Sequence, residues 1–341
     1  MVVQTFWASI LVFGLLIIFH ELGHFIAAKR VGIKVHEFSV GFGPKLLSFP
    51  RGETAYNLRL FPLGGFVRMA GMDPSEEVEE EERSYQNKTV GQRAVVIAAG
   101  PLMNFLLAAL LLMIIFMVQG FPTPTTTIGK LVSGQPADNA GLKPGDKIVA
   151  INDKPVERWE DVTALVNAHP GQPITVIVLR NGEEKRFELV TAVNNEGKGM
   201  IGIYPRQEMR QLGPLAALYR GMEYTVRLSG LILEFIGRMI IGQAPAEIGG
   251  PVRIVQEIHT AVRMGFFYLL QLAAFLSINL GLFNLLPIPA LDGSRLIFLA
   301  LEGLRGRPVD PAKENFVHLV GFGLLLLLIM VITYKDILGL L

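Results

Sequence analysis

The sequence contains no cysteine, and this absence restricts the chemistry that the protein can carry. Without thiols there is no disulfide framework and no thiolate metal site, so any zinc ion must be held by histidine and carboxylate side chains. The net charge is also close to zero, at +1 for 341 residues, which excludes strong electrostatic attraction to nucleic acid as a main function. The segment Met1 to Phe19 lacks the positive region and small-residue cleavage site of a secretory signal, so we interpret it as part of a retained span.

Apolar residues, by contrast, are abundant: 51% of the chain is hydrophobic, and its mean hydropathy is +0.43. A helix needs about 20 mostly apolar residues to cross a bilayer. Four segments meet this requirement, and they run from about Thr5 to Ala28, Ala94 to Val118, Phe266 to Leu286 and Val317 to Tyr334. The sequence therefore predicts a multi-pass α-helical membrane protein with four transmembrane helices.

Basic residues near the spans predict the orientation of the chain, because cytoplasmic loops are enriched in lysine and arginine. No basic residue precedes the first span, whereas Lys29 and Lys34 follow it closely. Further basic residues lie between the third and fourth spans. We therefore expect both termini and residues 119–265 outside the cytoplasm, and residues 29–93 inside it.

The segment between the second and third spans has the pattern of a soluble α+β module. Within residues 126–192, a helical stretch ends at Pro170-Gly171, and two alternating strands flank the hairpin signal Asn181-Gly182. The order of these elements around "AGLKPGDKIVAIN" resembles a PDZ domain of bacterial proteases, a module that captures extended peptides by strand addition. Residues 205–262, which follow it, predict amphipathic helices associated with the membrane.

The loop before the second span has a different character. Residues 35–69 alternate apolar and polar side chains and contain glycine-rich turns, which predicts a membrane-associated β-hairpin or small sheet on the cytoplasmic side. The first domain, 1–118, would thus comprise two spans and this β-loop. The last domain, 263–341, would comprise the other two spans.

Two histidines lie inside the first span. In "HELGH", His20 and His24 are four residues apart, so on a helix they share a face and can chelate one ion. Glu21 lies beside them without ligating, which is the position of the general base in this motif. Catalytic zinc usually takes three protein ligands, so a third must come from elsewhere in the chain.

The third span offers this ligand. It ends in "NLLPIPALDG", where the prolines interrupt the helix and Asp292 follows the break. Alone, Asp292 would read as a helix cap or turn residue, but together with the histidines it is better interpreted as a metal ligand. The same span contains Asn279 and Asn284, for which hydrogen bonding between helices and substrate binding are equally good interpretations.

Taken together, these motifs resemble the site-2 protease family of intramembrane zinc metalloproteases, in its bacterial regulator-of-sigma-E protease type with a single PDZ domain. The matching segments are "HELGH" at 20–24, "VGFGPKL" at 40–46, "FPLGGFVRM" at 61–69, "AGPLMNF" at 99–105, "GGPVRIVQ" at 249–256 and "NLLPIPALDG" at 284–293. The resemblance implies Zn²⁺ bound by His20, His24 and Asp292. It also implies a catalytic Glu21 and an asparagine near the zinc at Asn284. Many relatives carry two PDZ modules in tandem, whereas this chain has room for one.

The resemblance also implies a function. The protein would hydrolyse peptide bonds within transmembrane segments of single-span proteins, such as anti-sigma factors or signal-peptide remnants, after another protease has trimmed them. It would lie in a bacterial inner membrane, bind peptide termini at its extracytoplasmic PDZ-like module, and bind no nucleic acid. The alternatives are a metal-binding membrane transporter, which should show inverted repeats, and an inactive PDZ membrane scaffold, which the intact HELGH motif disfavours.

Overall fold

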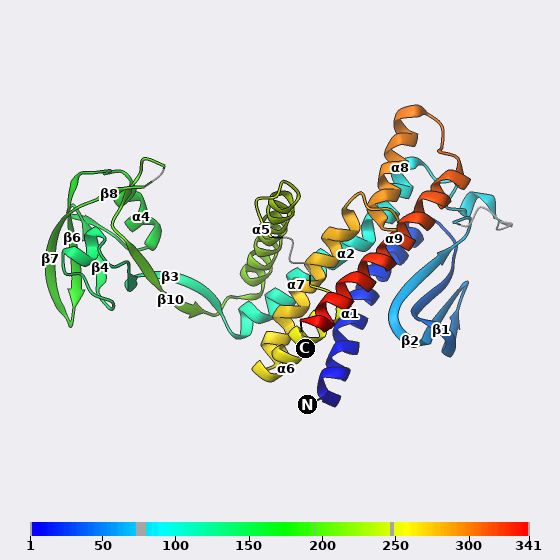
Figure 1. Ribbon diagram of the computed structural model, residues 1–341, viewed down its shortest axis with the longest axis horizontal. Coiled ribbons are helices and arrows are strands. Elements are labelled where there is room, and N and C mark those ends of the chain that lie inside the picture. Colours follow the sequence, from blue (N-terminus) through cyan, green and yellow to red (C-terminus); the bar gives the residue numbers. More distant parts are fainter. Residues whose placement is uncertain (1, 73–79, 195, 246–248, 340–341) are drawn as a thin grey trace. The chain divides into compact units, whose positions relative to one another are not determined.

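The structure of the protein is a computed structural model, and the residues that it describes are 2–72, 80–194, 196–245 and 249–339. The chain divides into two compact units (Figure 1). One consists of Met1–Ile115 together with Pro214–Leu341, and the other of Phe116–Gly213. The second unit is therefore a single insertion into the chain of the first.

Four helices among the described residues of the first unit are long and apolar enough to cross a membrane. They are α1 (Val2–Arg30), α2 (Val90–Val118), α7 (Phe266–Leu285) and α9 (Pro311–Leu338). The four spans predicted from hydropathy are therefore present. Each helix except α7 begins before and ends at or after its predicted span, because helical hydrogen bonding continues into polar flanks that hydropathy excludes.

A small antiparallel sheet follows α1, and it consists of β1 (Val35–Arg51) and β2 (Thr54–Met69). Ser39 in β1 pairs with Asn57 on one side and with Phe66 on the other, so both long strands are bent and pair with each other in two registers. The bend in β1 uses Gly41, whose φ of +88° favours glycine. The β-hairpin or small sheet predicted from the alternating pattern is present in this segment.

A buried carboxylate stabilises this sheet. The side chain of Glu37 is only 10% exposed, and it accepts hydrogen bonds from the hydroxyl of Ser39 and, at 2.5 Å, from the guanidinium of Arg59. Burial alone raises the pKa of Glu37, but these hydrogen bonds outweigh it and lower the pKa to about 2. Glu37 is therefore ionised at neutral pH, and its charge is compensated inside the sheet.

The inserted unit is built on a mainly antiparallel sheet with strand order β10-β3-β4-β6-β7, and β5 pairs with β4. The strands of this unit are β3 (Phe121–Leu131), β4 (Lys147–Ile151), β5 (Lys154–Pro155), β6 (Pro173–Arg180), β7 (Glu183–Val190), β8 (Ala192–Val193), β9 (Gly199–Met200) and β10 (Ile203–Arg210). Helices α3 (Pro136–Asn139) and α4 (Trp159–Asn167) complete it. The predicted hairpin is present, because β6 and β7 pair across Asn181 and Gly182, both of which have positive φ.

Three more helices belong to the first unit, and they are α5 (Pro214–Ile240), α6 (Pro251–Met264) and α8 (Asp292–Arg305). A short 3₁₀ turn, Glu81–Arg83, precedes α2. The range 205–262, predicted to form amphipathic helices, begins instead in strand β10. The first of these helices starts only at Pro214, because proline fits the first helical turn, whereas residues 203–210 pair with β3.

Candidate metal centre

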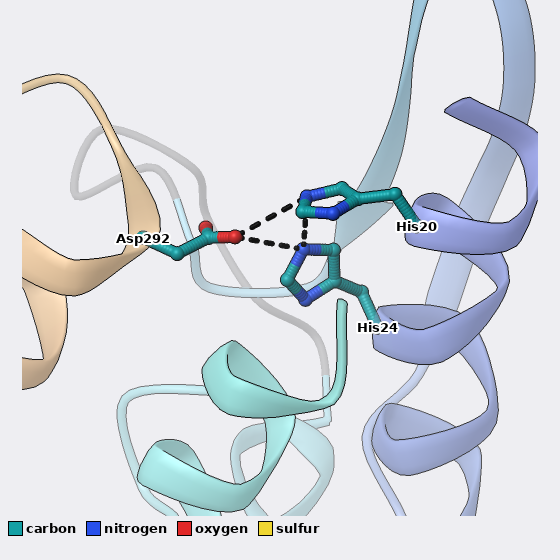
Figure 2. A group of neighbouring side chains, drawn as sticks. All are labelled: His20, His24 and Asp292. Carbon is teal, nitrogen blue, oxygen red and sulfur yellow. Dashed lines mark hydrogen bonds and ion pairs between the residues drawn. The ribbon is translucent and has the colours of Figure 1, made fainter. Parts of the chain in front are cut away.

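Three potential ligands from distant parts of the sequence converge in the first unit. His20 and His24 lie one turn apart on α1, and Asp292 is the first residue of α8 (Figure 2). Oδ2 of Asp292 lies 3.2 Å from Nε2 of His20 and 3.4 Å from Nε2 of His24. The two Nε2 atoms are themselves 3.2 Å apart. Among the described residues, these three side chains form a group that could hold a metal ion.

The spacing of these three atoms fits zinc. Zinc–ligand bonds of about 2.0–2.1 Å in a tetrahedron put neighbouring ligand atoms about 3.3–3.4 Å apart. The observed separations of 3.2, 3.2 and 3.4 Å are close to this value. In addition, Oδ2 of Asp292 is buried and has no hydrogen-bond partner. A divalent cation would satisfy this oxygen and both imidazole nitrogens together.

Helix α2 fixes the position of the His24 ring. Nδ1 of His24 donates a hydrogen bond of 2.9 Å to the carbonyl of Val96, which leaves Nε2 directed toward Asp292. Two glycines allow the close approach of the helices. A Cβ on Gly23 would lie 2.2 Å from the carbonyl oxygen of Ala99, and a Cβ on Gly100 would lie 2.3 Å from Nε2 of His24. The ring therefore occupies space that any larger residue at position 100 would fill.

The loop that leads to Asp292 contacts helix α9. Helix α7 ends at Leu285, and the chain turns through Ala290, whose φ of +73° is unusual for a residue with a side chain. The backbone N–H of Ala290 donates to Nδ1 of His318 on α9, at 3.1 Å. No local sequence signal could have revealed this contact.

Glu21 lies next to the three potential ligands. It interacts electrostatically with both histidines and with Asp292. Strand β2 passes beside it, and a Cβ on Gly65 would lie 3.0 Å from Cγ of Glu21. The absence of a side chain at Gly65 therefore allows β2 to pack closely against Glu21.

The two asparagines of α7 lie differently. The side-chain amide of Asn279 donates to the carbonyl of Phe275, and that of Asn284 donates to the carbonyl of Leu280. Both carbonyls belong to the same helix, so these contacts are not the hydrogen bonds between helices that we considered. Both asparagines are partly exposed. A role in substrate binding stays a prediction for both.

One polar residue beside the site escaped the sequence analysis. Asn104 on α2 is fully buried, and its side-chain nitrogen lies 3.2 Å from Nδ1 of His20. It lies in the segment "AGPLMNF", four residues after Gly100 and therefore on the same face of the helix. The spacing from Gly100 was visible in the sequence, but nothing there indicated that this face meets His20.

Four apolar helices and a largely buried His-His-Asp group beside a glutamate define a metalloprotease-type site within a membrane protein. Comparison with known proteins identifies the class further. Residues 8–328 match the model of the family described as Peptidase family M50. The chain belongs to this family, the site-2 proteases, as the sequence motifs predicted.

Relatives that match nearly the whole chain are zinc metalloproteases. The chain is 38% identical to "Zinc metalloprotease RasP" of Geobacillus kaustophilus, over 98% of each chain. It is 35% identical to "Regulator of sigma-W protease RasP" of Bacillus subtilis, over 99% of each chain. The protein is therefore an integral membrane zinc metalloprotease that acts in regulated intramembrane proteolysis, and its cofactor is zinc. The predicted activity and cofactor are confirmed.

Part of the chain is also similar to solved structures of PDZ domains. One is the PDZ domain of an SdrC-like protein from Listeria monocytogenes, which is 14% identical, with a TM-score of 0.22, and the match covers 24% of this chain and 87% of that one.

Proposed function

We propose that His20, His24 and Asp292 hold the zinc ion and that Glu21 is the catalytic base. The observation that supports this most strongly is the triangle of ligand atoms with sides of 3.2, 3.2 and 3.4 Å. Its size suits tetrahedral zinc and leaves a fourth position for water or substrate. The reaction is hydrolysis of a peptide bond within the transmembrane segment of a single-span protein.

Each residue at the site has a separate role in the proposed hydrolysis. When bound, zinc supplies Lewis acidity, which polarises the scissile carbonyl and makes water a stronger acid. Glu21 accepts the proton of the attacking water and delivers it to the leaving amine. The hydrogen bond from His24 to Val96 keeps the ring from turning during this cycle. Gly65 allows strand β2 to lie against Glu21, because a Cβ there would lie only 3.0 Å from Cγ of Glu21.

Substrate binding uses the polar end of α7 and the small sheet. A helical peptide bond is shielded, so the substrate segment must unwind, and an unwound segment can add to the edge of the β1–β2 sheet as a further strand. Asn284 binds the substrate backbone or the developing oxyanion, and for this its amide leaves the carbonyl of Leu280. Asn279 is the weaker candidate for this role because it lies further along α7 from the loop that precedes Asp292.

The PDZ-like module, residues 126–192, binds the termini of substrates that another protease has already trimmed. A cavity of about 220 Å³ supports this role, and its lining includes Trp159, Val162 and Val166 of α4 and residues 199–204. Such an apolar groove between a helix and an extended segment suits one end of an extended peptide. With the single module, the chain filters substrates by their termini.

The bacterial relatives support placement of the protein in a bacterial inner membrane, and the basic residues near the spans support its orientation there. Both termini and the PDZ-like module lie outside the cytoplasm, and the β1–β2 sheet lies on the cytoplasmic side. Residues 1–118 and 263–341 form the membrane-embedded catalytic domains, and helices α5 and α6, which begin within residues 205–262, are the amphipathic helices at the membrane surface. Anti-sigma factors, by analogy with the relative named a regulator of sigma-W, are the proposed substrates.

The decisive experiment compares Glu21→Gln with the unmodified protein on a single-span substrate in lipid vesicles. Loss of the proton acceptor should reduce cleavage by roughly 10²–10⁴-fold while zinc content stays unchanged. Glu234→Gln is the matched control, because Glu234 is exposed on α5 and pairs only with Arg238. If Glu21→Gln cleaves as fast as this control, Glu21 is not the base. Mass spectrometry of peptides retained by Glu21→Gln then identifies the natural substrates.

A further inference from the structure

The partner of the His20 ring is a buried asparagine whose hydrogen bonds are incomplete. Asn104 is 0% exposed, and its backbone carbonyl accepts a hydrogen bond of 2.8 Å from Ser277. Its side-chain nitrogen lies 3.2 Å from Nδ1 of His20. Its side-chain oxygen is buried and has no hydrogen-bond partner. A buried acceptor without a donor is costly, so this arrangement calls for an explanation.

The chemistry of a histidine ligand supplies one. A neutral imidazole that binds a metal through Nε2 carries its single proton on Nδ1, and that N–H needs an acceptor. An amide NH₂ group cannot accept it, whereas the amide oxygen can. Nitrogen and oxygen of an asparagine amide occupy nearly interchangeable positions. Rotation of the Asn104 amide by half a turn therefore brings its unpartnered oxygen to Nδ1 of His20.

We propose that Asn104 is a positioning residue of the zinc site: its side-chain oxygen accepts the Nδ1–H of His20 and keeps Nε2 directed at the metal. This inference rests on the proposed role of His20 as a ligand. The other histidine has the corresponding contact, because Nδ1 of His24 donates to the carbonyl of Val96.

Both ring contacts come from one face of α2. Val96, Gly100 and Asn104 follow one another at intervals of four residues, so they lie along a single stripe of the helix. The carbonyl of Val96 contacts Nδ1 of His24, and the side chain of Asn104 contacts Nδ1 of His20. Gly100, between them, makes room for the His24 ring. Helix α2 thus sets the orientation of both imidazoles on α1.

The test measures zinc affinity, by competition with a chromophoric chelator, on the full-length protein in detergent micelles. Asn104→Leu has nearly the same shape but no acceptor, and it should weaken zinc binding about 10–100-fold. Asn104→Asp keeps an acceptor and should bind zinc within about threefold of the unmodified protein, or more tightly, because carboxylates are common partners of ligating histidines. Ser277→Ala removes a neighbouring buried hydrogen bond and should leave affinity within about twofold.

The direct readout is the tautomer of His20 in the zinc-loaded protein, observed by ¹⁵N NMR of labelled histidine rings and assigned with His20→Gln. We expect the proton on Nδ1 in the unmodified protein and in Asn104→Asp. A proton on Nε2, or equal weakening of zinc binding by the Leu and Asp variants, would overturn the proposal, because the amide would then act as a donor. Unchanged zinc affinity in His20→Gln would instead refute the ligand set itself.

Discussion

Replacing Gly100 with alanine tests how tightly α2 is fitted against the metal centre. The added Cβ would lie 2.3 Å from Nε2 and 2.5 Å from Cε1 of His24. Carbon atoms need about 3.5 Å from such neighbours, so the ring or the helix must move by roughly 1.2 Å. Zinc–ligand distances in a working site vary by only about 0.2 Å. The displacement is several times this tolerance, so we expect zinc affinity to fall by at least about 100-fold.

The assay for this variant is zinc competition together with cleavage of a single-span substrate. Alanine is a better helix former than glycine by about 1 kcal/mol, so a loss of zinc cannot be attributed to weakening of α2. Gly91→Ala is the matched control, because Gly91 lies on the same helix and a Cβ there would meet nothing within 4 Å. If both variants bind zinc with affinities within threefold of each other, the fit that we infer around His24 does not exist.

Three further predictions concern other parts of the structure. Asp292→Ala should lower zinc affinity at least about 100-fold. The control Asp310→Ala removes a side chain that accepts a hydrogen bond from the backbone N–H of Ala312 at the start of α9, and it should leave zinc affinity unchanged. Equal zinc affinities of the two variants would exclude Asp292 as a ligand. Because the pKa of Glu37 is lowered from 4.5 to about 2, its ionised carboxylate stabilises the sheet at pH values above 4.5. This stabilisation, up to roughly 3 kcal/mol, should disappear as the pH falls toward 2. Protection of residues 35–69 from hydrogen exchange should therefore decrease across this range, and Glu37→Gln should show a flat profile. Asn284→Ala should lower turnover without release of zinc; release, measured by metal analysis, would make Asn284 structural.

Much of the metal centre could be predicted because its signals are local. The four-residue spacing of His20 and His24 fixes a shared helix face, and the prolines before Asp292 indicate where the helix must open. The direction of the spans then predicts a common depth for all three residues. The three side chains do converge in the structure. Each part of the prediction used a property of a single segment, which the sequence shows directly.

The contacts around the ligands could not be predicted in the same way. The pairing of Asn104 with His20 depends on the rotation of α2 about its axis, and the contact of His318 with Ala290 depends on how α9 crosses the loop. Both are properties of packing between helices, which one amphipathic pattern does not determine in spans that are apolar on all sides. The change of register between β1 and β2 depends on how the two strands pair, and the alternation of apolar and polar residues did not show it.

The pairing of β3 with β10 has a consequence for how this protein evolves. Phe121 lies opposite Arg210, so the inserted unit begins and ends at adjacent points of its own sheet. An insertion with adjoining ends behaves as a cassette, which can be exchanged, duplicated or deleted without stretching the segments that flank it. Selection can therefore change the inserted unit while the group formed by His20, His24 and Asp292, which belongs to the other unit, stays as it is.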